Sequence, residues 1–128
     1  MPNEAAPSKA MFWAGWVLSS IPIIFLGSGA LFALSHASFV MEGMGKYGFT
    51  PSFTTIVGMC ELLCVLFYAA PRTAPIGAML MTAYMGAAVI THLRAEESQW
   101  IVPVVFCVIV WAGLLLRRPS LRTAILGV

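Results

Sequence analysis

Four long apolar runs limit what this chain can fold into. They cover residues 11–35, 53–70, 75–93 and 99–116. An α-helix rises about 1.5 Å per residue, so each run is long enough to cross a hydrocarbon core of about 30 Å. Lipid offers the backbone no hydrogen bonds, and strand-length alternating segments are too few for a barrel. The sequence therefore predicts an all-α integral membrane four-helix bundle, antiparallel and up-down-up-down, as a single domain of residues 1–128.

The composition favours a membrane protein and excludes other classes. Hydrophobic residues make up 60% and charged residues 9% of the chain, against near half and about a quarter in soluble domains. The apolar runs lack the polar face that a soluble helical bundle presents to water. A net charge of +2 without a basic patch argues against nucleic-acid binding. There is no Asp and no phosphate-binding loop, so the sequence does not indicate soluble-type catalysis and identifies no catalytic residue.

Basic residues are shared unevenly between the two ends of the predicted bundle. Both termini and the turn after the second run lie at one end with five basic residues, against two at the other end. The positive-inside rule then predicts a multi-pass protein of the bacterial inner membrane with both termini in the cytoplasm. Residues 36–52 are the extracytoplasmic loop, which we expect to lie on or dip into the interface, and residues 117–128 are a basic cytoplasmic tail. The five basic residues are Lys9, Arg72, Arg117, Arg118 and Arg122.

Glu61 is the most informative single residue. It lies about eight positions into the second run, or about 12 Å below the outer surface. A charged group at that depth costs ~3 kcal/mol or more, so such residues usually face the interior of a bundle. Desolvation favours the neutral form of the carboxyl unless it is paired. Two interpretations follow, a functional carboxyl in a binding pocket and a structural carboxyl that hydrogen-bonds between helices.

Counting along the other runs places further polar residues near the depth of Glu61. Ser28, Tyr84 and Cys107 fall at that level, and we predict that the four residues surround one midplane pocket. His92 ends the third run on a broad face that it shares with Tyr84, so it is predicted at the outer mouth of this pocket. There it could transfer protons or bind a polar head group. The alternative is a histidine that only caps the helix and interacts with its dipole.

The other histidine and the cysteines do not indicate a metal or thiol-redox site. His36 and Glu42 lie near His92 along the predicted outer end, but their spacing resembles no metal site. Cys60 and Cys64 are separated by three residues rather than by the two of a dithiol motif. All three cysteines fall in apolar runs, where a low dielectric disfavours the thiolate. We expect them to be packing residues, and no covalently bound cofactor is implied.

Several short stretches, in order, resemble the DoxX-like family of small four-helix membrane proteins. The resemblance covers about residues 20–120, and the order of the stretches is more specific than any one of them. It implies a four-helix membrane bundle, and some members act as subunits or partners of quinone-linked or thiol-redox systems. Many members place a Lys shortly after the Ser-Gly pair, where this chain has Phe32, so an ion pair with the membrane carboxylate does not carry over. The stretches are Phe25-Leu26-Gly27-Ser28-Gly29, Tyr47-Gly48-Phe49, Gly58 with Glu61-Leu62, Pro71-Arg72 and Thr91-His92-Leu93-Arg94.

Three functions remain open at this point. The first, which we favour, is a membrane subunit or binder of a lipophilic redox molecule, a quinone or another lipid, held by Glu61 and Tyr84 with His92 at the mouth. The second is a proton-coupled transporter of small molecules, similar to the small multidrug resistance proteins, although that family carries its glutamate in the first helix. The third is an accessory protein without chemistry. Four short helices make a small core, so beside the lipid bilayer we expect a homo-oligomer or a partner membrane protein.

Overall fold

The computed structural model describes residues 8–128, and every regular element in this part of the chain is helical. Four of the helices are long and apolar enough to cross a membrane. The predicted all-α four-helix bundle is therefore confirmed, although residues 1–7 of the predicted domain lie outside the described part. The elements are α1 (Lys9–Leu34), α2 (Ser38–Lys46), α3 (Pro51–Ala69), α4 (Ala74–Arg94), a 3-10 turn η1 (Ser98–Trp100), α5 (Ile101–Arg117) and α6 (Pro119–Leu126).

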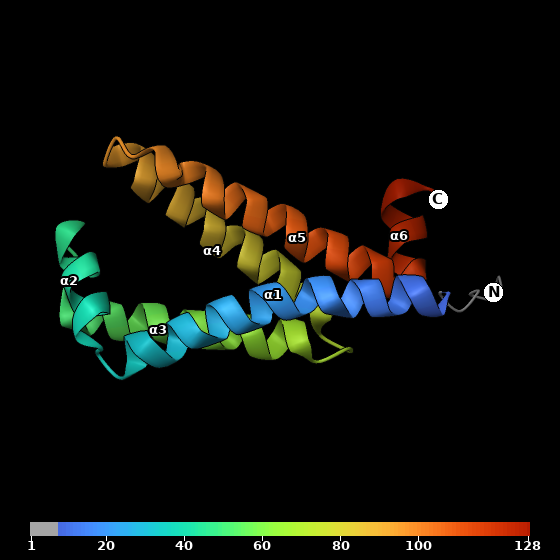
Figure 1. Ribbon diagram of the computed structural model, residues 1–128, viewed down its shortest axis with the longest axis horizontal. Coiled ribbons are helices and arrows are strands. Elements are labelled where there is room, and N and C mark those ends of the chain that lie inside the picture. The colour runs from blue at the N-terminus through green and yellow to red at the C-terminus, as the bar shows by residue number, and fades with distance from the viewer. Residues whose placement is uncertain (1–7) are drawn as a thin grey trace.

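The four long helices form a ring in which each contacts two neighbours. Helix α1 packs against α3 and α5, and α4 packs against the same two helices from the other side. The pair α1 and α3 and the pair α4 and α5 lie close together at the end that carries the described N-terminus and α6 (Figure 1). Toward the other end the two pairs diverge (Figure 1). We call these the closed end and the open end of the bundle.

Small residues explain why the closed end is tight. A Cβ atom on Gly15 of α1 would lie 2.7 Å from the backbone nitrogen of Arg117, and one on Gly113 of α5 would lie 2.7 Å from the Ser19 hydroxyl. Such distances leave room only for glycine, so α1 and α5 approach closely here. The Tyr68 side chain is fully buried in this region, and its hydroxyl donates a hydrogen bond to the Val110 carbonyl at 2.8 Å. The core of the bundle therefore lies toward the closed end.

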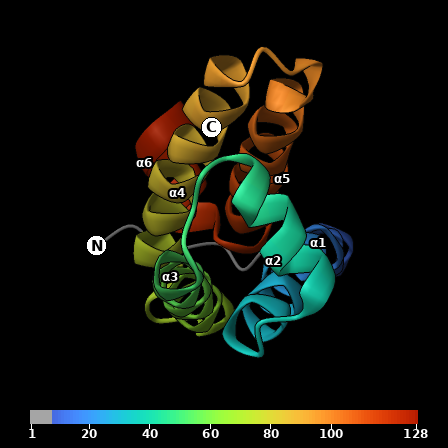
Figure 2. The same ribbon diagram turned by 90° about the vertical axis from the view of Figure 1, so that its left-hand side faces the viewer.

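Two short helices that the sequence does not predict cross the ends of the bundle. Helix α2 lies within the predicted loop of residues 36–52 and passes across the open end (Figure 2). None of its residues is buried. Helix α6 lies within the predicted basic tail, transverse to the long helices (Figure 1). Each is too short to span a membrane, which leaves both at the level of the bundle ends.

The outward faces of the long helices are apolar. Val17, Ile24, Ile90 and Val108 are each more than 60% exposed, and lipid is the solvent that such a surface requires. The chain is thus a multi-pass membrane protein with four candidate spans in contact with the bilayer.

Candidate functional site

A direct hydrogen bond joins the two central residues of the predicted site. The Tyr84 hydroxyl of α4 donates to Oε1 of Glu61 in α3 at 2.6 Å. The other carboxyl oxygen, Oε2, is buried without a hydrogen-bond partner among residues 8–128. A Cβ atom on Gly29 of α1 would lie 3.4 Å from Oε2, so the carboxyl group occupies space that a larger residue at position 29 would restrict. Glu61 therefore faces the interior of the bundle, between α1, α3 and α4.

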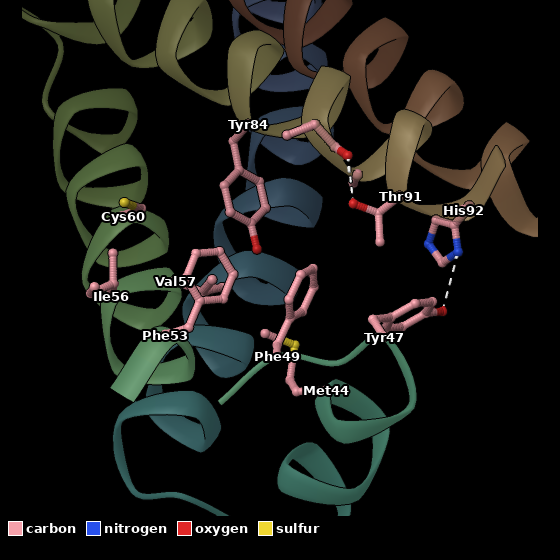
Figure 3. A pocket seen from close by; sticks show the side chains of 12 residues that line it. Met44, Tyr47, Phe49, Phe53, Ile56, Val57, Cys60, Tyr84, Thr91 and His92 are labelled. Carbon is pink, nitrogen blue, oxygen red and sulfur yellow. Dashed lines mark hydrogen bonds between the residues drawn. The ribbon is translucent and has the colours of Figure 1, made fainter. Parts of the chain in front are cut away.

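A cavity of about 340 Å³ adjoins this pair at the open end. It lies between α3 and α4 where the helices diverge, and residues of the α2–α3 connection close its outer side (Figure 3). The Tyr84 ring projects from α4 into this space toward Phe49 and Phe53 (Figure 3). Tyr84 thus links the cavity to the Glu61 carboxyl behind it. The lining consists of Met44, Tyr47, Phe49, Phe53, Ile56, Val57, Cys60, Tyr84, Ala87, Ala88, Thr91 and His92.

A second, smaller cavity continues the first along the same two helices. Its volume is about 260 Å³, and it shares Cys60 and Tyr84 with the larger cavity. Leu63 and Leu80, which also line it, are 52% and 39% exposed on the outer face of the bundle. Together the two cavities form an apolar groove between α3 and α4 that opens toward lipid. We call this the α3–α4 groove.

Three polar side chains form a cluster at the outer mouth of the groove, which we call the clasp. Oε2 of Glu97 accepts a hydrogen bond from the Tyr47 hydroxyl at 2.9 Å and lies 2.8 Å from Nδ1 of His92. Tyr47 and His92 also approach each other, at 3.4 Å (Figure 3). Tyr47 follows α2, His92 is in the last turn of α4, and Glu97 follows the turn after α4. The clasp therefore ties the α2–α3 connection to the end of α4.

Local backbone geometry brings Glu97 back toward His92. Glu96 adopts a left-handed φ of 56°, and the Glu97 amide donates to the His92 carbonyl at 3.0 Å. This closes α4 with a tight turn and returns the next side chain to the helix end. Hydrogen bonds from His92 and Tyr47 lower the pKa of Glu97. Burial, together with the hydrogen bond to Glu97, raises the pKa of Tyr47, so an ionised carboxylate accepts from a protonated phenol at neutral pH.

The structure brings together three of the five residues that the sequence predicts for the site. Glu61 and Tyr84 are bonded to each other, and His92 lines the same cavity as Tyr84. Ser28 instead lies on an exposed face of α1, where its hydroxyl donates to the Phe25 carbonyl of its own helix at 2.9 Å. Cys107 packs against the hydrophobic core from α5 and does not line the groove.

The site also contains residues that are not predicted from the sequence. Tyr47 and Glu97 complete the clasp, and Cys60 lines both cavities. Glu97 could have been found from the sequence, because it lies five positions after His92 across a short polar turn. Among residues 8–128 no group of three or more His, Cys, Asp or Glu side chains is arranged to hold a metal ion. His36 instead contacts the Thr55 hydroxyl at 2.6 Å.

The clasp leads to a prediction about pH. The pKa of Glu97 is lowered in the folded protein. The clasp therefore stabilises the α2–α3 connection fully at any pH above 4.5, the ordinary pKa of the carboxyl, and this stabilisation is lost as the pH falls through the lowered pKa. We expect amides 47–50 to be protected from hydrogen exchange, after correction for intrinsic rates, from neutral pH down to about 4.5. Glu97→Gln should lose this protection even at neutral pH.

Glu96→Gln is the matched control, since Glu96 is the neighbouring carboxyl and makes no side-chain hydrogen bond in the clasp. It should leave both the protection and its pH dependence unchanged. Equal effects of the two substitutions would show that the negative charge of the turn, and not the clasp, orders the connection.

Comparison with known proteins identifies one family. Residues 17–113 match the DoxX-like family. No curated protein and no solved structure matches the chain. The match begins within α1 and ends within α5, so it covers α3 and α4 completely, most of α1 and α5, and every residue of the groove and the clasp. This covers well over half of the chain, and the resemblance seen in the sequence is confirmed: the chain belongs to the DoxX-like family.

Proposed function

We propose that this protein binds a lipophilic redox molecule, a quinone or a similar ring-bearing lipid, in the α3–α4 groove. The observation that carries the proposal is the half-buried, hydrogen-bonded Glu61–Tyr84 pair beside an apolar cavity of about 340 Å³. Binding sites for small molecules are typically apolar cavities of roughly 300–1,000 Å³ with a few placed polar groups. The larger cavity meets both conditions.

The pair supplies the polar recognition that a ring oxygen needs. The Tyr84 hydroxyl lies at the cavity and can donate to a carbonyl oxygen of the ligand in place of Glu61 Oε1. Glu61 would then hold or exchange the proton behind it, since its Oε2 is buried without a partner in the described chain. Proton transfer through a hydrogen-bonded phenol and carboxyl is the chemistry that a quinone–quinol conversion requires at its oxygens. The redox molecule itself would supply the electron chemistry.

The shape of the groove favours a ligand with a head and a tail. The larger cavity lies at the open end beside the clasp, and the smaller cavity runs from Tyr84 toward the middle of the bundle. An isoprenoid or acyl tail would lie along Leu63 and Leu80, which also face the bilayer. We infer that the ligand moves in sideways from the lipid. If the closed end faces the cytoplasm, as the positive-inside rule predicts for its basic residues, the head group lies near the outer leaflet of the inner membrane.

The test is mass spectrometry of the lipophilic molecules retained by the gently purified protein and by Glu61→Gln. We expect the parent protein to retain a quinone and Glu61→Gln to retain less, because a carboxamide still accepts from the Tyr84 hydroxyl but cannot hold or exchange the carboxyl proton. Tyr84→Phe removes the hydroxyl that donates to the ring oxygen and should retain at least about tenfold less, the cost of one lost hydrogen bond. Ser28→Ala is the control, because Ser28 lies outside the groove, and it should retain as much as the parent protein. Equal retention by parent and Glu61→Gln would overturn the role of the carboxyl.

The same preparations separate the other two functions. Release of protons on addition of a lipophilic cation, lost in Glu61→Gln, would support the transporter instead. A protein that holds no small molecule but co-purifies with a second membrane protein would support the accessory subunit.

A further inference from the structure

The closed end of the bundle collects positive charge from four separate segments. They are the start of α1, the α3–α4 turn, the end of α5 and the start of α6 (Figure 1). Among residues 8–128, no Asp or Glu side chain belongs to any of these segments, since the four glutamates of that part lie in α2, at mid-α3 and in the turn after α4. The basic residues are Lys9, Arg72, Arg117, Arg118 and Arg122.

Arg117 is the buried member of this group. It is 5% exposed, and its guanidinium carbon lies 4.2 Å from the Trp16 ring centre and 4.9 Å from the Tyr68 ring centre. One guanidinium nitrogen donates to the Tyr68 carbonyl at 3.0 Å. Nε is buried without a hydrogen-bond partner in the described part of the chain. The aromatic rings hold the cation in a fixed position but do not neutralise its charge.

The position of Arg117 along its helix places this charge near the membrane boundary. It is the last residue of α5, which is the final candidate span. Lipid phosphates lie at this depth, and a guanidinium matches the oxygens of a phosphodiester with paired N–H donors. A phosphate group is therefore the counterion that both the charge and the location of Arg117 favour.

Helix α6 extends this surface across the end of the bundle. It lies transverse to the spans (Figure 1), with Leu121 packed against the core and Ile125 and Leu126 more than half exposed. Arg118 directly precedes α6, and its guanidinium donates to the Pro71 carbonyl in the α3–α4 turn at 2.7 Å. Arg122 lies within α6, with a guanidinium nitrogen 3.9 Å from the sulfur of Met11 in α1. A helix that combines exposed apolar residues with basic ones lies in the membrane interface, with its cations at the level of the head groups.

We propose that the closed end binds the head group of an anionic phospholipid, with Arg118 and Arg122 as its contacts and the fixed charge of Arg117 beneath them. This site is separate from the α3–α4 groove and does not depend on the ligand proposed there. The same chemistry would also accept free phosphate, but the transverse α6 with its exposed Ile125 and Leu126 favours a phosphate that belongs to a lipid.

The test compares two variants that each remove two positive charges. Arg118→Gln/Arg122→Gln changes the proposed site, and Lys46→Gln/Arg94→Gln changes the open end. Native mass spectrometry would measure lipid adducts on the full chain in detergent with added phosphatidylglycerol or phosphatidylcholine. We expect the parent protein and the open-end variant to bind phosphatidylglycerol more tightly than phosphatidylcholine. The closed-end variant should bind phosphatidylglycerol at least about tenfold more weakly than the parent protein. Thermal unfolding in phosphatidylcholine confirms that both variants are folded.

Three results would overturn the proposal. Equal loss in both variants would mean that net charge alone attracts the lipid. Equal binding of the two lipids by the parent protein would mean that no anionic site exists. Displacement of phosphatidylglycerol by millimolar inorganic phosphate would mean that the site takes the free anion instead of the lipid.

Discussion

Gly77→Ala is expected to prevent α4 from packing against α3 and to lower the free energy of unfolding by ~3 kcal/mol or more. A Cβ atom on Gly77 would overlap the backbone nitrogen and Cα of Tyr68 and would lie 2.7 Å from the carbonyl carbon of Phe67. These are backbone atoms of a helix, which cannot rotate away as a side chain can. Tyr68 is itself fixed by its hydrogen bond to the Val110 carbonyl, so the overlap would displace the whole α3–α4 contact.

Gly86→Ala is the matched control for this prediction. Gly86 lies on the same helix, and a Cβ atom there would meet nothing within 4 Å. Its substitution should leave stability unchanged or raise it by up to about 1 kcal/mol, because alanine favours a helix over glycine. The measurement is reversible unfolding in mixed micelles of mild detergent and dodecyl sulfate. Similar losses for the two substitutions would show that glycine matters here for helix flexibility and not for close packing.

The fold was predictable because the length of the apolar segments is its strongest determinant. The four apolar runs correspond to the four long helices, since a backbone in lipid has no alternative to helices of this length. The short helices α2 and α6 were missed for the same reason. Helix α2 has nine residues and α6 has eight, too few to stand out as membrane spans. Their position at the ends of the bundle, rather than a long periodic pattern, decides that they form.

The sequence predicts the depth of the site residues along the bundle but not the rotation of each helix about its own axis. Counting residues from the ends of the runs correctly placed Tyr84 opposite Glu61. It also placed Ser28 at that level, yet Ser28 faces outward while its neighbour Gly29 faces the carboxyl. Adjacent residues of a helix point about 100° apart, and only a polar face reveals which of them is turned inward. Helix α1 is apolar on all sides, so its sequence carries little of that information.

The clasp could not be predicted because it depends on the backbone conformation of two short polar segments, and their sequences do not determine it clearly. Glu97 reaches His92 because Glu96 adopts a positive φ. Tyr47 reaches the same carboxylate across the α2–α3 connection, from a residue 50 positions away in the chain. Contacts between distant loops depend on how far the helix pairs diverge, which is a property of the assembled bundle.

A double-mutant cycle should measure a coupling of ~2 kcal/mol in the free energy of unfolding between Glu61 and Tyr84. Tyr84→Phe alone would leave both carboxyl oxygens without a partner, since Oε2 already has none among residues 8–128. Glu61→Leu alone would leave the phenol hydroxyl without its acceptor. The double variant removes both polar groups together, and we expect it to be nearly as stable as the parent protein.

The cycle of Tyr84→Phe with Ser28→Ala provides the control, because the Ser28 hydroxyl donates to the Phe25 carbonyl of its own helix on an outward face of α1. These two substitutions should be additive. Additivity in the Glu61–Tyr84 cycle as well would mean that the 2.6 Å contact contributes nothing to the fold in lipid. A measured coupling would instead show that the bundle maintains a half-buried acid and phenol in contact at the edge of an apolar groove. Two apolar side chains could pack at this position without polar groups to satisfy. A polar pair kept there is therefore best explained by a ligand whose oxygen takes the place of Glu61 Oε1 as the acceptor of the Tyr84 hydroxyl.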